Sequence, residues 1–512
     1  MSKRRGIIIV LLLFAIIVVV GFAMRDQNDV SAEPNVSVEE STEPNTMSSE
    51  ALAEIERAEK EKREAEEKAI AEAEAIEAQR IRDEMIQAFT YFVIPGGTTV
   101  YKESDSSSEQ VGKLTGKSAI FVEEMIEDDA GKIVFMKIKD SIDDNETLGF
   151  ISAQAVEKTL EPFIAKKYDD VDYTPFQKND RSAYGPSDGV KAIFVTGHSA
   201  QGSKMDELIT LIEETQLNAV VIDVKDDIGH LLFKSEAAAL YNPAAYEHYY
   251  IEDMDAFVDK LKAKDIYMIA RIVTFKSPIY AKSHPERAIV YKSNNALYSD
   301  GDRLIWASPH DRVLWDYNIA VAKEAAEYGF DEIQFDYVRF PAIANRNAMD
   351  YRNEHGESPT AAIQSFLKTA YQALDAYEVA ISADVFGWAA SATDDVGIGQ
   401  HWEAISNVVD VISPMMYPSH YGPGNFGLSV PDAFPYETID RSVKEALERN
   451  RNLQTPGRIR PWIQDFTATW VKGYIRYGAK EVRAQIDALE ANGITEYLLW
   501  NAGNFYSRNA FK

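Results

Sequence analysis

From residue 189 onward, short apolar segments alternate with longer amphipathic ones. The apolar segments have the length and composition of buried strands and lie at Lys191–Val195, Ala219–Val224, Tyr267–Val273, Glu332–Tyr337, Val379–Asp384, Val411–Met416, Ile459–Gln464 and Glu496–Asn501. The amphipathic segments predict helices at Lys204–Glu214, Met254–Lys264, Leu314–Tyr328, Ala361–Ala376, Thr438–Glu448 and Val482–Ala491. Eight such repeats predict a parallel (β/α)8 TIM barrel over residues 189–508. An open doubly wound sheet is the alternative, but no GxGxxG motif follows the first strand to support dinucleotide binding.

Residues 90–158 have a different pattern, in which short segments rich in β-branched and aromatic residues are separated by polar turns. This pattern predicts a small all-β barrel, followed by a linker over residues 159–188. The order VYKESDSSSEQVGKL, a central strand and then LGFIS resembles bacterial SH3-like domains. The resemblance implies either a module that binds a cell-wall ligand or one that packs against a neighbouring domain.

The N-terminus carries a basic cluster, Lys3–Arg5, followed by an uncharged run from Gly6 to Met24. A run of this length can cross a bilayer as a helix, and the basic cluster then stays in the cytoplasm. We therefore predict a transmembrane anchor over residues 1–25, localisation to the cell membrane and an extracellular remainder. The alternative is a signal peptide cleaved near Val30–Ala32, which makes the protein secreted.

Two polar segments connect this run to the β-rich region. Residues 26–49 are rich in Ser, Glu, Asn and Pro and predict a disordered linker. Residues 50–87 contain mostly Ala, Glu, Lys and Arg, with opposite charges at helical spacing such as Glu56 and Lys60. They predict a charged helical spacer. Oligomerisation through a coiled coil is the alternative, although the apolar residues keep no heptad.

Composition excludes several classes of function. The chain has 53 Lys and Arg against 82 Asp and Glu, a net charge of −29 that argues against a nucleic-acid partner. It has no Cys, which rules out disulfides, thiolate nucleophiles and Cys-based metal centres. Its eight His form neither an HExxH motif nor a His-x-His pair. We therefore predict no metal site and no cofactor.

Polar and aromatic residues gather where the predicted strands end, and this is the end of a TIM barrel that carries the active site. The candidates are Asp223, Lys225, Arg271, Gln334, Asp336, Tyr337, Arg339, Asp384, Trp388, Tyr417, Gln464, Asp465, Trp500 and Asn501. Strand alternation places Gln334 and Asp336 on one face and gives Asp465 the opposite parity from Gln464. A carboxylate buried at the end of an apolar strand is costly unless it is paired or used in chemistry.

Each candidate also has a purely structural interpretation. An aspartate after a strand commonly caps the next helix, Arg271 and Arg339 could be ion-pair partners at the barrel rim, and the aromatic candidates could belong to the core. These interpretations do not explain why acidic, amide and aromatic residues recur at the same end of several strands. Aromatic rings with a few carboxylates and amides suit a sugar, whose C–H face stacks on the rings.

Two carboxyl groups are the requirement for glycoside hydrolysis, one as nucleophile or base and the other as proton donor. This chemistry needs neither a metal nor a cofactor. A serine hydrolase requires a GxSxG elbow, which the sequence lacks. A metal-dependent deacetylase requires paired His and Asp ligands, and none are suitably spaced.

Five motifs, in order, resemble the "putative glycoside hydrolase" barrel domain of exported bacterial proteins, over about residues 189–506. They are VIDVKDDIG, LIWASPHDRVLWDYNIAVAKEAAEYGFDEIQFDYVRFP, ISADVFGW, VISPMMYPSHY and YLLWNAGN. The resemblance implies a TIM barrel distantly similar to the α-amylase type. It further implies that Asp336, on strand four, is the nucleophile and that Asp384, on strand five, is the proton donor.

The sequence departs from the amylase pattern at three positions. Gln334 stands where that pattern has an arginine, Asp384 stands where it usually has a glutamate, and its third acid could only be Asp465. A retaining mechanism requires carboxyl groups about 5–5.5 Å apart, and inversion about 6.5–9.5 Å. As proton donor, Asp384 also needs a raised pKa.

The sequence therefore predicts a membrane-anchored glycoside hydrolase that acts on an envelope or extracellular polysaccharide. Asp336 and Asp384 are its predicted catalytic residues, and the other candidates bind substrate. One alternative is a non-catalytic carbohydrate-binding protein on a degenerate barrel. Another is a structural envelope protein that binds no saccharide.

Overall fold

The protein divides into two compact units, residues 1–162 and 163–512. The computed structural model describes residues 5–8, most of 78–93, and residues 98–114, 118–142, 146–158, 165–179 and 185–512. The predicted disordered linker and most of the predicted helical spacer lie outside these residues.

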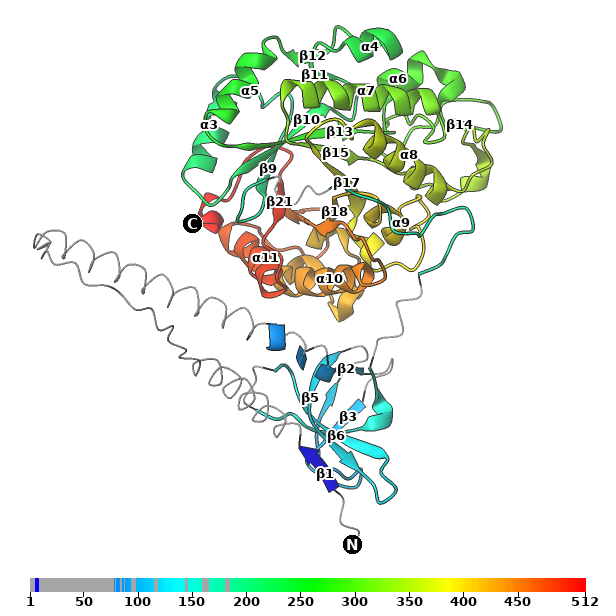
Figure 1. Cartoon of the computed structure of the whole chain (residues 1–512). Coiled ribbons are helices and arrows are strands. Elements are labelled where there is room, and N and C mark those ends of the chain that lie inside the picture. The colour runs from blue at the N-terminus through cyan, green and yellow to red at the C-terminus, as the bar shows by residue number, and fades with distance from the viewer. Residues whose placement is uncertain are drawn as a thin grey trace, which may run out of the picture. The chain divides into compact units, whose positions relative to one another are not determined.

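The first unit contains an antiparallel sheet (Figure 1), as the pattern of residues 90–158 predicts. Its strands are β2 (Thr90–Val93), β3 (Thr98–Tyr101), β4 (Gln110–Leu114), β5 (Ala119–Glu127), β6 (Ile133–Lys139), β7 (Gly149–Ser152) and β8 (Val156–Glu157), with the 3₁₀ helix η1 at Ala153–Ala155. They pair in the order β4-β3-β7-β6-β5-β2-β8. Val122, Ile138 and Ile151, from three neighbouring strands, belong to its apolar core. The resemblance to SH3-like domains stays a prediction.

Most of the predicted membrane anchor falls on residues 9–25, which lie outside the described residues. Arg5–Ile8 forms a short strand, β1, that pairs with β5. Among the described residues, no helix combines the length and the apolar character that crossing a membrane requires. The anchor and the cellular location therefore stay predictions.

The second unit is a closed barrel of eight parallel strands, which confirms the predicted TIM-barrel fold (Figure 1). In barrel order the strands are β9 (Lys191–Val195), β10 (Ala219–Lys225), β13 (Tyr267–Val273), β15 (Glu332–Asp336), β17 (Ala380–Phe386), β18 (Val411–Met415), β20 (Trp462–Gln464) and β21 (Tyr497–Trp500). β21 pairs with β9 and closes the barrel. The seventh predicted strand is interrupted, because Pro461 lacks an N–H and separates β19 (Arg458–Ile459) from β20.

Helices surround the barrel and cover the outward faces of its strands (Figure 1). The predicted helices are present as α3 (Gly202–Glu213), α5 (Met254–Lys262), α7 (Arg312–Tyr328), α8 (Pro359–Ala373), α10 (Pro435–Asn450) and α11 (Ala479–Ala491). The sequence pattern missed three short helices, α4 (Glu236–Tyr241), α6 (Pro278–Ser283) and α9 (Trp402–Ser406). Five or six residues are too few to produce a helical period.

Further short strands and 3₁₀ helices lie in the loops between these strands and helices. The additional strands are β11 (Leu231–Phe233), β12 (Tyr249–Ile251), β14 (Val290–Tyr291) and β16 (Met349–Asp350). The 3₁₀ helices are η2 (Pro243–Ala245), η3 (Pro285–Arg287), η4 (Arg346–Ala348), η5 (Gly387–Ala390), η6 (Pro418–His420), η7 (Asn425–Gly427), η8 (Pro431–Ala433) and η9 (Arg508–Phe511). Several of them follow the carboxyl ends of barrel strands and so shape the rim of the predicted site.

A buried ion pair lies inside the barrel towards the amino-terminal ends of the strands. Nη1 of Arg460 donates to both carboxylate oxygens of Glu332, at 2.9 and 2.8 Å. The hydroxyl of Tyr267 donates to Glu332 at 3.1 Å, and Arg460 also donates to Glu496 at 3.3 Å. We call Glu332, Arg460, Glu496 and Tyr267 the lower cluster. Both oxygens of Glu332 have partners there.

Candidate active site

A second ionic cluster lies inside the barrel at the carboxyl ends of the strands. Asp223 lies near the carboxyl end of β10, Arg271 lies on β13 as its Cα partner, and Asp336 ends β15. One guanidinium nitrogen of Arg271 donates to Asp223, and two others donate to Asp336. All three side chains are buried. The arginine charge only partly offsets the cost of burying Asp223, because burial still raises the pKa of this carboxyl to about 7. With Asp384, these residues form what we call the upper cluster.

Asp336 is held on both of its oxygens. Nε and Nη2 of Arg271 lie 2.9 and 2.5 Å from Oδ2, and the backbone N–H of Tyr337 donates to Oδ1 at 2.5 Å. Tyr337 has a φ of 47°, in the left-handed region that non-glycine residues rarely adopt. Such backbone strain concentrates at functional sites. Every one of these contacts stabilises the ionised carboxylate and fixes its orientation.

Arg271 also accounts for one departure from the amylase pattern. Gln334 occupies the position of the family arginine, and Arg271 is its Cα partner on the neighbouring strand. The cation that contacts Asp336 therefore comes from β13 instead of from β15. Gln334 itself is buried, and neither atom of its amide has a hydrogen-bond partner among the described residues.

Asp384 is in a different environment from Asp336. It is fully buried at the end of β17, where Oδ1 accepts a hydrogen bond from Nε1 of Trp462 at 2.7 Å. Oδ2 has no partner among the described residues. Burial, together with the charge of Asp336, raises the pKa of Asp384 well above its ordinary value. The pKa of Asp384 is therefore shifted in the direction that a proton donor requires.

Aromatic rings pack beside the upper cluster. The ring of Trp500 stacks on Phe194, with centroids 4.2 Å apart, and the guanidinium of Arg271 lies 5.4 Å from both rings. Tyr417 is buried beside Trp500, at 6.5 Å. Trp388 is 41% exposed in η5, directly after the strand that carries Asp384. Trp388 is thus the most accessible of the three predicted stacking residues.

Two cations lie beside Tyr337, the residue that follows Asp336 in the sequence. Tyr337 lies beneath two cations, with Nζ of Lys276 at 4.6 Å and the guanidinium of Arg339 at 5.0 Å from its ring. Lys225, in contrast, is buried with Nζ 3.5 Å from the carbonyl of Thr274 and 5.5 Å from the ring of Tyr317 on α7. Burial lowers the pKa of Lys225 to about 7.

The remaining candidates are engaged by other protein groups. The amide of Gln464 donates to Asp432 at 3.0 Å and accepts from the backbone of Ser419 at 3.1 Å. Both oxygens of Asp465 accept hydrogen bonds from Ser507, at 2.7 Å each. The amide of Asn501 donates to the carbonyl of Asp465 at 2.6 Å. These bonds fix the loops after strands six to eight, and the predicted binding roles of the three residues stay predictions.

A family model described as "Putative glycosyl hydrolase domain" matches residues 192–506. The chain belongs to this family. The match covers more than half of the chain and spans the whole barrel except the start of β9. The barrel is therefore a glycosyl hydrolase domain. No curated protein matches the chain.

Solved structures similar to the chain include a hypothetical protein from Ruminiclostridium thermocellum, with 31% identity over 38% of this chain and 97% of that chain, at a TM-score of 0.34. The glycoside hydrolase domain of PgaB (BpsB) from Bordetella bronchiseptica has 11% identity over 61% of this chain and 94% of its own, at a TM-score of 0.45. A variant of the glycoside hydrolase domain of PelA from Pseudomonas aeruginosa has 13% identity over 63% and 97%, at a TM-score of 0.36.

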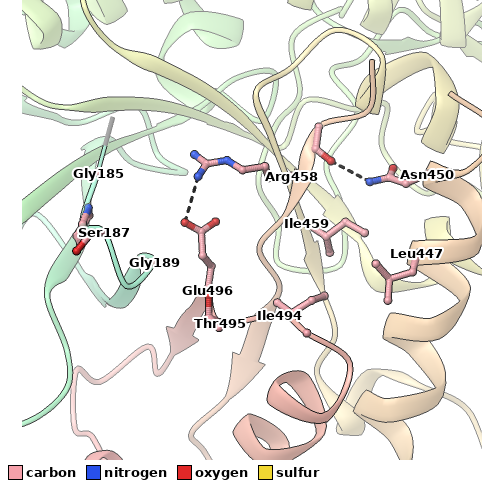
Figure 2. Close-up of a pocket in the computed structure, with 13 residues that line it drawn as sticks. Gly185, Ser187, Gly189, Leu447, Asn450, Arg458, Ile459, Ile494, Thr495 and Glu496 are labelled. Atoms are coloured by element: carbon pink, nitrogen blue, oxygen red, sulfur yellow. Dashed lines mark hydrogen bonds and ion pairs between the residues drawn. The ribbon is translucent and has the colours of Figure 1, made fainter. Parts of the chain in front are cut away.

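The glycosyl hydrolase domain has a pocket of about 660 Å³ at the opposite end of the barrel from the upper cluster (Figure 2). Gly185–Gly189 precede β9, Arg458 begins β19, and Thr495 and Glu496 precede β21, so the pocket lies at the amino-terminal ends of the strands. Arg458 and Glu496 form an ion pair across it, at 3.4 Å. TIM-barrel chemistry takes place at the other end, so this pocket is not the candidate active site.

Sequence reasoning missed several residues of this candidate site. Trp462 donates to Asp384, and Lys276 and Phe386 extend the rim. Phe386 could have been found, because it shares the strand-five face of Asp384 at a spacing of two. Trp462 contacts Asp384 across 78 residues of sequence, a contact that depends on barrel geometry. Among the described residues, no group of three or more His, Asp or Glu is arranged to hold a metal ion.

Proposed function

We propose that the barrel cleaves glycosidic bonds of an envelope or extracellular polysaccharide by a two-carboxylate mechanism. Asp336 attacks the anomeric carbon, and Asp384 donates a proton to the leaving oxygen. Asp384 then activates the water that completes the reaction. No metal or cofactor takes part in this scheme.

The observation that carries the proposal is the contrast between the two carboxyl groups. Asp336 receives hydrogen bonds from Arg271 and from the Tyr337 backbone, whereas Asp384 receives one from Trp462 and is otherwise buried without a partner among the described residues. Neighbouring carboxyls whose environments differ in this way can serve as nucleophile and acid at the same pH. Membership of the glycosyl hydrolase family supports the same conclusion.

The proposed location follows from the sequence. The basic cluster Lys3–Arg5 and the uncharged run after it favour a membrane anchor with the barrel outside. An extracellular barrel meets envelope and capsular polymers before any cytoplasmic sugar. The SH3-like segment would bind a cell-wall ligand in this arrangement.

The function is tested by incubating the full-length chain and its Asp336→Asn variant with a panel of bacterial wall and capsular polysaccharides. Released oligosaccharides are scored by mass spectrometry. We expect the parent to release products from at least one polymer and the variant to release none. The matched control is Asp331→Asn, which changes an aspartate at the start of the same strand that accepts a hydrogen bond from the Met268 backbone.

Two outcomes would reject the proposal. Equal release by the parent and Asp336→Asn would remove Asp336 from the chemistry. Binding of a polysaccharide by both proteins, with no release by either, would favour a carbohydrate-binding protein on a degenerate barrel. Retained release by Asp331→Asn is required in either case, because it shows that an aspartate-to-asparagine change does not unfold the barrel.

A further inference from the structure

Arg339 is a cation at the rim of the site for which the described residues provide no carboxylate partner. It lies three residues after Asp336, where Nη1 donates to the carbonyl of Phe340 at 3.0 Å. Its other guanidinium nitrogens form no hydrogen bond or ion pair with any described residue, and none of them is fully enclosed by protein. Arg339 is half-buried and retains donors that have no partner among the described residues.

Three aromatic rings hold the guanidinium in place. Its centre lies 4.7 Å from the ring of Trp306, 5.0 Å from Tyr337 and 4.5 Å from Phe386. Tyr337 directly follows Asp336, and Phe386 lies two residues beyond Asp384 on the same strand face. Both catalytic strands thus position this arginine. A guanidinium already fixed by packing loses little entropy when it binds a ligand.

Two other cations around the site, Arg271 and Lys276, already have carboxylate partners. Arg271 binds Asp223 and Asp336. Lys276 lies 3.6 Å from Asp227, 3.7 Å from Asp300 and 3.8 Å from Asp302. Arg339 differs from both, because no described carboxylate lies within ion-pair distance of it.

Asp300 is one of the acids whose charge acts on Arg339, but its oxygens are used elsewhere. Oδ2 accepts from Nε1 of Trp306 at 3.0 Å, and Oδ1 accepts from the backbone of Asp302 and Leu304 at 3.0 and 2.9 Å. Desolvation is the largest influence on Arg339 and lowers its pKa, although nearby tyrosines and aspartates oppose it. The guanidinium is thus partly stripped of water without receiving an anion in return.

We propose that Arg339 binds the carboxylate of an acidic sugar residue next to the bond that is cleaved. The inference rests on the proposed function, because it assumes that a saccharide occupies this end of the barrel. The planar guanidinium presents parallel donors that match the two oxygens of a carboxylate. A neutral hydroxyl would leave most of the charge unpaired. The inference therefore narrows the substrate class to polysaccharides that contain uronic acids or carboxylate-substituted sugars.

The test measures binding, so it does not depend on turnover. The full-length Asp336→Asn variant is titrated at 0.15 M salt with three carboxylated probes: oligogalacturonate, hyaluronan oligosaccharides and peptide-free peptidoglycan strands. Each probe is compared with its carboxyl-reduced form, which keeps the sugar backbone and loses the charge. We expect at least one acidic probe to bind about 10- to 100-fold more tightly than its reduced form.

Variants of Arg339, made in the Asp336→Asn background, test whether Arg339 causes this preference for the acidic form. Arg339→Gln should bind the acidic and reduced forms equally, and Arg339→Lys should keep part of the preference because it retains the charge without the planar fork. Arg303→Gln is the control, since Arg303 is an exposed arginine in the neighbouring loop and its variant should keep the full preference.

Three results would overturn the inference: no acidic probe preferred over its reduced form, a preference that survives Arg339→Gln, or tight binding of a sulfated oligosaccharide in place of the carboxylated probes. The first and third results are obtained without an arginine variant. The inference can therefore be rejected even if Arg339→Gln does not fold. Failure of the proposed function can be told apart from failure of this inference. It appears as absent turnover in the parent protein, whether or not the acidic probes bind.

Discussion

The barrel contains two buried arginine–carboxylate clusters, one near each end, and they differ in how completely their carboxylates are paired. In the lower cluster both oxygens of Glu332 bind Arg460, and the charges of Arg460 and Arg458 lower the pKa of Glu496 against the effect of burial. In the upper cluster Arg271 pairs with Asp223 and Asp336, while Asp384 has one oxygen without a partner among the described residues. Buried ion pairs alone therefore do not distinguish structure from function.

The distinction lies in the incomplete pairing. A buried carboxyl without a counter-ion has a raised pKa, which favours its use as a proton donor. The upper cluster places such a group, Asp384, beside Asp336, whose carboxylate is paired with Arg271. We infer that the lower cluster holds the barrel together and that the upper cluster performs the reaction.

The largest expected effect comes from Asp336→Asn. It removes the nucleophile and should lower turnover at least about 1,000-fold, or about 4 kcal/mol of activation free energy. Asparagine has the same shape and keeps one of the two acceptor oxygens, so the variant should remain folded at a cost in stability from the lost pairing with Arg271. Initial rates on the polysaccharide identified by the panel, with far-ultraviolet circular dichroism as the folding check, measure both quantities. Retention of even a tenth of the parent rate would contradict the assigned role.

Arginine variants separate the two clusters. Arg460→Met leaves Glu332 buried without its cation and should reduce the free energy of unfolding by about 3–5 kcal/mol. Turnover per folded molecule should stay near the parent value, because Arg460 does not touch the upper cluster. Arg271→Met should cost a similar amount of stability and also abolish turnover. Urea denaturation paired with rates per folded molecule measures the contrast, and a loss of turnover in folded Arg460→Met would contradict it.

A double variant tests the structural role of the lower cluster more closely. Glu332→Met combined with Arg460→Met removes both charges of the lower pair. Because an apolar pair of similar volume avoids the desolvation cost, the double variant should be more stable than either single variant. The same denaturation experiment measures it. A double variant less stable than both single variants would mean that the cluster contributes more than mutual charge neutralisation.

The pH dependence of stability should change in Asp384→Asn. The pKa of Asp384 is higher in the folded protein than in the unfolded chain, so the folded state binds this proton more tightly. Its contribution to stability therefore falls as the pH rises from the unfolded pKa of about 3.9 towards the folded pKa. Asparagine does not titrate, and the variant should gain stability relative to the parent as the pH rises above about 4. A difference that stays constant with pH would show that folding does not raise the pKa of Asp384.

The smallest expected effect comes from Trp462→Phe, which removes the hydrogen bond to Asp384. That bond lowers the pKa of Asp384, so its loss should raise the pKa and move the alkaline limb of the kcat profile to higher pH. The stability cost should be about 1 kcal/mol. A limb that moves to lower pH would mean that Trp462 stabilises the protonated form.

The fold and the positions of the key acids could be predicted because both depend on local pattern. Strand-length apolar segments placed Asp336 and Asp384 at the carboxyl ends of neighbouring strands, where parallel pairing brings them together. The contacts that distinguish them could not be predicted. Arg271 is 65 residues from Asp336 in sequence, and its contact with that acid follows from the register of β13 against β15.

Side-chain partners limited the prediction elsewhere too. Gln464 and Asn501 have the residue types and strand positions of substrate-binding groups, yet hydrogen bonds to Asp432 and to the Asp465 backbone engage them. From the sequence alone, Arg339 could equally be a substrate-binding residue or an ion-pair partner at the barrel rim. Only the three rings around it and the absence of a carboxylate partner among the described residues indicate an anion site.

The most direct test of the account compares two leaving groups. The Asp336→Asn and Asp384→Asn variants are assayed on the polysaccharide and on an activated aryl glycoside of the same sugar, whose leaving group needs no proton. Asp384→Asn should lose about 100- to 10,000-fold on the polysaccharide and form the glycosyl-enzyme from the aryl glycoside at near the parent rate, with azide accelerating its turnover. Asp336→Asn should lose both activities. Equal losses on the two substrates in Asp384→Asn would contradict the assignment of Asp384 as the proton donor.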